Sequence, residues 1–251
     1  MKSLLPILLL FALSYSTIQA QGITSHQYRR VAPADMEEYL KRETTYWQKF
    51  AENEVKKGNM TFWGVFQRVG GTSQESEPNI LIINTFKDID KGADWASVAD
   101  LFPDVKMEDI QTWSICTNTD QIFLRGLGNH IQVENPEFNF VRVIYHKVKN
   151  AATSLTFEEE KWKPMLQKAM EEGTTNMQGW GNAIIVGPKS DDFDYDVYTY
   201  DLFASAHAAL SPNFTEDHQM PDGFWDGIEG NANGPRHTNL YRIVAVVTDD
   251  N

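Results

Sequence analysis

Cysteine is almost absent from this chain. The 251 residues contain one cysteine, Cys116, so neither an internal disulfide nor a metal site built from several thiolates can form. Basic residues are also scarce, with 22 Lys and Arg against 35 Asp and Glu and a formal net charge of -13. Nucleic acid and anionic membranes repel a chain of this charge, so we expect neither as a partner.

Long apolar runs are missing after residue 20. Before that point, Lys2 precedes the apolar run Leu4 to Leu13, and Ala20 ends a short stretch of small and polar residues. This is the layout of a cleaved secretory signal peptide, and the run is too short for a comfortable membrane span. We therefore expect a signal peptide at residues 1–20, a secreted or periplasmic protein, and no membrane contact after cleavage.

The motifs of common enzyme and cofactor classes are lacking as well. The sequence has no GxSxG, no GxxxxGK[ST] and no GxGxxG after a strand. The acidic loop 211–238 lacks HExxH or a comparable metal spacing. Its candidate ligands are His218, Asp222, Asp226 and His237. We predict no cofactor and no metal site, and we interpret the loop as a lid that carries Phe224 and Trp225.

Two similar halves are what the sequence does contain. Each half has, in this order, the pattern of a long amphipathic helix, two strands and a short helix. In the first half these patterns lie at 34–57, 61–66, 79–86 and 94–102. In the second half they lie at 156–172, 177–186, 193–200 and 202–210. Trp47 and Trp162 lie 115 residues apart, and Trp63 and Trp180 lie 117 apart. Pro164 is expected to kink or divide the second long helix. The charge run 158–160 is interpreted as a solvated first helical turn.

Further strand patterns complete each half. They lie at 26–31, within 121–133, at 138–149 and at 240–248. The resulting order β-α-β-β-α-β is the ferredoxin-like unit, whose sheet has helices on one face only. We therefore predict an α+β fold with two tandem ferredoxin-like repeats, 21–135 and 136–251, packed sheet to sheet as a dimeric α/β-barrel-like unit. The protein is expected to be a monomer or a homodimer.

Two segments carry a resemblance to a known superfamily. They are YLKRETTYWQKFAENEVKKGNMTFWGVFQRV (39–69) and FEEEKWKPMLQKAMEEGTTNMQGWGNAIIV (157–186). Their layout and tryptophan placement resemble the dimeric α/β-barrel superfamily, in particular NIPSNAP-like and stress-response barrel domains, over most of residues 23–248. The superfamily includes cofactor-free monooxygenases, haem-using enzymes, sugar mutarotases and proteins with no known reaction. The resemblance therefore implies a scaffold and leaves the reaction open.

Strand alternation sorts the side chains that would face a barrel interior. In strand 138–149, Val141, Val143 and Tyr145 share one face, which we assign to the helices. Arg142 and His146 lie on the opposite face and are expected to line the interior as the catalytic candidates. The candidate ligand-binding residues are Trp63, Trp180, Asn182, Tyr200, Phe224, Trp225 and Arg242.

The predicted function is that of an exported protein that binds a small organic ligand inside the barrel. One alternative is a cofactor-free monooxygenase or isomerase in which His146 is the base and Arg142 orients the substrate. A second alternative is a haem-binding barrel enzyme with His207 as the ligand. A third is a barrel with a filled interior that serves interaction or stress protection. Packing roles for Trp63 and Trp180 also stay open.

Overall fold

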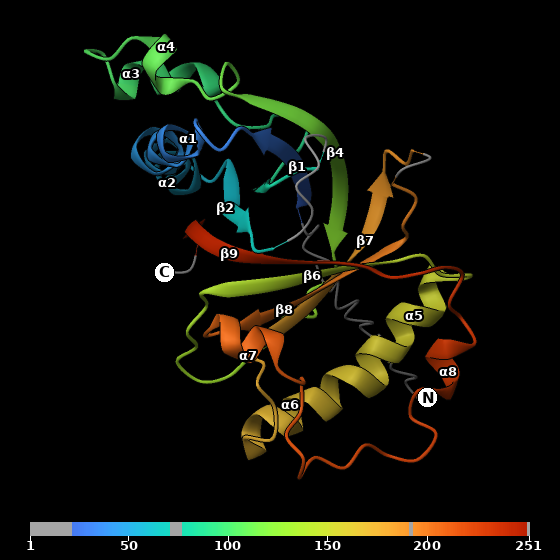
Figure 1. Cartoon of the computed structure of the whole chain (residues 1–251). Coiled ribbons are helices and arrows are strands. Elements are labelled where there is room, and N and C mark those ends of the chain that lie inside the picture. Colours follow the sequence, from blue (N-terminus) through green and yellow to red (C-terminus); the bar gives the residue numbers. More distant parts are fainter. Residues whose placement is uncertain (1–21, 71–76, 191–192, 250–251) are drawn as a thin grey trace, which may run out of the picture.

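A closed β-barrel forms the centre of the molecule, and the helices lie outside it in two groups, α1 to α4 and α5 to α8 (Figure 1). The computed structural model describes residues 22–70, 77–190 and 193–249. The expected signal peptide at 1–20 lies outside the described residues. Over the described ranges, no helix has the length and apolar character needed to cross a bilayer.

Eight of the described strands close the barrel, and all of their pairings are antiparallel. Their order is β4-β1-β3-β2-β9-β6-β8-β7, and β7 pairs back to β4. The bounds are β1 (Ile23–Val31), β2 (Met60–Arg68), β3 (Ile80–Phe86), β4 (Cys116–Gly126), β6 (Phe140–His146), β7 (Gly179–Gly187), β8 (Val197–Phe203) and β9 (His237–Thr248). A short strand, β5 (Ile131–Gln132), extends the sheet beside β7. The order 4-1-3-2 in the first half recurs as 9-6-8-7 in the second.

Two long helices lie outside the barrel, one for each half (Figure 1). The first consists of α1 (Met36–Arg42), the π-helical turn η1 (Glu43–Trp47) and α2 (Gln48–Lys56). The second consists of α5 (Ala151–Phe157), the π-helical turn η3 (Glu158–Trp162) and α6 (Lys163–Glu172). The short helices are η2 (Trp95–Ser97), α3 (Val98–Leu101), α4 (Met107–Ile110), α7 (Ala206–Leu210) and α8 (Asp226–Glu229).

Both long helices are interrupted at the same relative place. Each π-helical turn begins with a buried glutamate, Glu43 or Glu158, and ends with a tryptophan, Trp47 or Trp162. Pro164 lies in the first turn of α6, directly after η3, and the backbone stays helical from η3 into α6. The first long helix has the same π-helical turn without a proline, so this turn does not depend on Pro164. Turns of π-helix inside α-helices are frequent at functional sites.

The barrel interior is filled with side chains from every strand of the ring. They include Tyr28, Phe66, Leu81, Ile122, Leu124, Val141, Val143, Tyr145, Ala183, Tyr198 and Tyr241. The predicted faces of β6 were therefore wrong: Val141, Val143 and Tyr145 point into the barrel, and the face of Arg142 and His146 points toward the helices. A closed ring buries its inner face more completely than helices bury its outer face, so the most apolar side-chain set belongs inside.

Candidate functional site

A cavity of about 320 Å³ lies between the second-half sheet and its long helix. The outer faces of β6, β7 and β8 form one wall, α5 and η3 form another, and the loop 211–238 closes the third. Its apolar lining includes Ile144, Phe157, Trp162, Trp180, Phe214, Met220, Trp225 and Ile228. We call this space the Glu158 cavity. Its size and aromatic walls are those of a site for a small organic molecule.

Glu158 is the acidic group of this cavity. It is the first residue of η3 and its side chain faces the sheet, so the residue is only 7% exposed. The Asn182 side chain, from β7, donates a hydrogen bond from Nδ2 to Oε2 of Glu158 at 2.7 Å. Burial raises the pKa of Glu158 to about 7, although this hydrogen bond and the positive charge of Arg236 oppose the rise. Glu158 can therefore both accept and donate a proton near neutral pH.

His146 lines the same cavity from the end of β6. Its Nε2 lies 3.2 Å from Oγ1 of Thr199 on β8. Burial lowers the pKa of His146 to about 4, and the positive charge of Arg236 lowers it further. The imidazole is therefore neutral near pH 7, where it offers hydrogen bonds without carrying a charge.

Arg142 lies beside the cavity and is held by an ion pair. Its guanidinium lies 3.1 Å from the carboxylate of Asp201 and also donates to Asn213, and both of these partners line the cavity. It further stacks over the Phe203 ring at 4.8 Å. Burial raises the pKa of Asp201 to about 6 despite the neighbouring guanidinium. Arg142 therefore positions two cavity groups through its contacts with them.

The loop 211–238 is attached to the second long helix. Trp225 lines the cavity and lies 5.5 Å from the Trp162 ring, and Phe224 packs behind it against Phe157 at 5.2 Å. Asn231 donates from its side chain to Oγ of Ser154 at 2.8 Å. Within the ranges that the structure describes, no three metal-ligating side chains come together, in this loop or elsewhere. The loop thus forms a wall of the cavity, and its opening as a lid stays a prediction.

The structure brings together only some of the residues singled out from the sequence. His146, Trp180 and Trp225 line the Glu158 cavity, and Asn182 holds Glu158. The others lie elsewhere: Trp63 lines a different cavity in the first half, Tyr200 packs on the barrel interior beside His130, Arg242 is exposed and donates to Gln67, and His207 is exposed on α7. Phe224 supports the wall from behind.

Glu158 is a candidate functional residue that the sequence patterns did not identify. It was assigned to a solvated first turn at 158–160, whereas the helix begins at Ala151 and Glu158 lies within it, facing the sheet. A signal was present: Glu43 and Glu158 lie 115 residues apart, which is the spacing of Trp47 and Trp162. A glutamate that keeps the register of two tryptophans packed against the core belongs to the face of the helix that is turned toward the sheet.

No known protein family matches the sequence, and no curated protein matches it. Solved structures do match. A candidate monooxygenase from Lactobacillus acidophilus NCFM has a TM-score of 0.56 at 15% identity, over 91% of this chain and 97% of that one. An anthrone oxidase-like protein has a TM-score of 0.56 at 10% identity, over 92% and 94% of the two chains. A candidate monooxygenase from Fusobacterium nucleatum has a TM-score of 0.53 at 10% identity, over 91% and 95%. At these identities the likeness shows the fold alone, which is that of the dimeric α/β-barrel proteins.

Proposed function

We propose that this protein binds a small planar aromatic compound in the Glu158 cavity and that Glu158 removes a proton from it, as the first step of a cofactor-independent oxidation. The observation that carries the proposal is a buried carboxyl group with a pKa of about 7 in an aromatic cavity. A general base works best when its pKa lies near the operating pH. This replaces the earlier assignment of His146 as base, because a pKa of about 4 makes that imidazole a weak base.

The remaining cavity groups suit the anion that such a step creates. Trp162, Trp180 and Trp225 provide flat walls for a planar ring. When a ring C–H loses its proton to Glu158, the electron pair spreads over the ring, where the neutral His146 can donate a hydrogen bond. Arg236, at the exposed edge of the cavity, favours negative charge there.

The oxidation balances with dioxygen as the only co-reactant. A ring methylene becomes a carbonyl, one oxygen atom enters the product and the other leaves as water, so four electrons pass from carbon to O₂. The anthrone class of substrate is suggested by one structural neighbour, and monooxygenation by two others.

Oxygen uptake with 1,8-dihydroxyanthrone tests this function, after subtraction of the uncatalysed rate. We expect Glu158→Gln to lose the enzymatic uptake, and Glu159→Gln, which changes an exposed neighbour, to retain it. The wild-type rate should rise with pH through an apparent pKa near 7. Equal rates for the wild type and Glu158→Gln would refute the catalytic role. If the protein binds the anthrone and no enzymatic oxygen uptake follows, it binds this ligand without oxidising it.

We also propose that the two halves are duplicated ferredoxin-like repeats, at 21–135 and 136–251. The recurring strand order and the matching π-helical turns support this. An experimental structure in which the two halves fail to superpose strand for strand would contradict it.

Export is proposed from the sequence of residues 1–20 alone. N-terminal sequencing of the protein recovered outside the cytoplasm should begin at Gln21, and a sequence that begins at Met1 would contradict it. No observation favours a haem held by His207, because this residue is exposed and does not line the cavity. The purified protein mixed with haem is expected to show no shift of the Soret band.

A further inference from the structure

A second cavity, of about 240 Å³, lies in the first half between the outer face of the β1–β3 sheet and the helix α1–η1–α2. Four tryptophans line it: Trp47, Trp63, Trp95 and Trp113. We call this space the Glu43 cavity. We infer that it is a second binding site, which holds an uncharged, planar bicyclic ring with an amide edge and performs no proton transfer.

The strand register places the two cavities at equivalent positions in the barrel. Trp63 pairs with Asn84, and Asn84 pairs with Ser25 on β1. In the second half, Trp180 pairs with Asp201, and Asp201 pairs with Arg142 on β6. Asn84 therefore occupies the place of Asp201. Four residues further along the first strand of each half, Arg29 occupies the place of His146.

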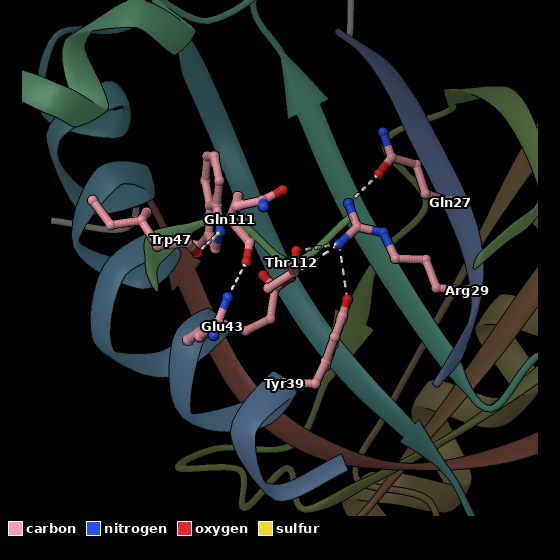
Figure 2. A network of polar contacts seen from close by, with 9 residues as sticks. Gln27, Arg29, Tyr39, Glu43, Trp47, Gln111 and Thr112 are labelled. Carbon is pink, nitrogen blue, oxygen red and sulfur yellow. Dashed lines mark hydrogen bonds and ion pairs between the residues drawn. The ribbon is translucent and has the colours of Figure 1, made fainter. Parts of the chain in front are cut away.

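The exchange of His146 for Arg29 changes the chemistry of the glutamate. Arg29 Nη1 lies 2.9 Å from Glu43 Oε1 and 2.8 Å from the Tyr39 hydroxyl (Figure 2). Thr112 donates to the same carboxylate oxygen at 3.0 Å, and Arg29 also donates to Gln27 at 2.7 Å. Glu43 is thus held as one member of an ion pair, while Glu158 is held by an amide. Among the described residues that line the Glu43 cavity, Arg29 and Glu43 are the charged ones, and they are paired with each other.

The side chain of Asn84 places an amide group in the lining of this cavity. Asn84 is 3% exposed as a residue and lines the cavity, and no hydrogen bond within the described ranges involves its side chain. Because the Asn84 side chain lines the cavity, a ligand with matching groups can form hydrogen bonds with its amide. An Asn side chain presents one donor and one acceptor side by side, which match the C=O and N–H of a lactam.

The tryptophan side chains of the cavity favour a ligand with a flat, apolar ring system. Trp113 is 63% exposed and Trp95 is 47% exposed, although indole rings normally bury most of their surface. Trp95 is held in place by stacking on Phe50 at 5.2 Å. A bicyclic ring between these indoles would cover both, and its lactam edge would reach Asn84.

Isothermal titration of the purified protein with 1H-quinolin-2-one tests the inference. We expect binding that is weakened about tenfold by Asn84→Leu, which keeps the side-chain size and removes both hydrogen-bonding groups. Trp113→Ala should weaken it several-fold, and because Trp113 is exposed this variant keeps its fold. Trp225→Ala, which alters only the Glu158 cavity, is the matched control and should leave this binding event unchanged.

The outcomes separate the two cavities. Absence of binding to the wild type at millimolar quinolinone overturns the inference. So does binding that is weakened by Trp225→Ala but not by Asn84→Leu or Trp113→Ala. Two binding events per chain, of which Asn84→Leu removes one, support it. None of these measurements depends on oxygen uptake or on Glu158. A result that refutes the proposed reaction would therefore not refute binding in the Glu43 cavity.

Discussion

Replacing Glu158 by glutamine should change how the stability of this protein depends on pH. In the folded chain the pKa of Glu158 is about 7, against an ordinary value of 4.5, and burial is the main cause. The folded chain therefore holds this proton more tightly than the unfolded chain does. The stabilisation by the proton is complete below pH 4.5 and is lost as the pH rises through 7.

The size of the effect follows from the difference between the two pKa values. About 2.5 pH units at about 1.36 kcal/mol each give a loss of about 3 kcal/mol between pH 4 and pH 8. Glutamine has no proton to lose, so Glu158→Gln lacks this loss. Asp201, whose pKa burial raises to about 6, titrates in both proteins, so most of its contribution cancels in the comparison.

Urea unfolding at pH 4 and pH 8 measures the difference. For the wild type, the free energy of unfolding should fall between the two pH values by about 3 kcal/mol more than for Glu158→Gln. The exposed neighbour provides the control, since Glu159→Gln should follow the wild type. If the wild type and Glu158→Gln change in parallel, Glu158 is not a buried acid of raised pKa, and the proton-transfer proposal loses its basis.

Three other substitutions give independent tests. Arg29→Met should lower the free energy of unfolding by about 3–5 kcal/mol, because Glu43 then stays buried without its cation; an unchanged urea midpoint would contradict this. Tyr145→Phe breaks the hydroxyl contact with Tyr28 inside the barrel and should cost about 1–3 kcal/mol, and the double Phe variant should recover part of the loss. Trp225→Ala should weaken hydroxyanthrone binding about tenfold, through loss of one aromatic wall, as measured by fluorescence titration; equal affinity would exclude this loop from the site.

The sequence predicted the order of elements well because that order depends on local patterns. The long helix expected at 34–57 is present as Met36–Lys56, and the strand expected at 79–86 is present as Ile80–Phe86. Helical spacing and turn residues depend on positions that lie close together in the chain, so both can be recognised from the sequence alone. The spacing of paired tryptophans then pointed to a barrel fold, which the solved structures share.

The faces of the strands were harder to predict, because they depend on what covers each face. Val143 and Ile144 are both apolar. The alternation of side chains along a strand places them on opposite faces of the sheet, but it does not determine which of the two faces the helices. Tyr145 was assigned to the helix side, yet its hydroxyl finds a partner in Tyr28 across the barrel. The role of Glu158 likewise depends on Asn182, which is 24 residues away in the chain and adjacent in space.

The place of β9 in the ring has a consequence for how the protein is made. β9 follows all the other strands in the chain, yet it lies between β2 and β6 and joins the two halves. While a ribosome is still synthesising residues 237–248, β2 and β6 have no partner at these edges. The nascent chain therefore exposes two open strand edges until synthesis passes this segment, and such edges invite pairing with other chains.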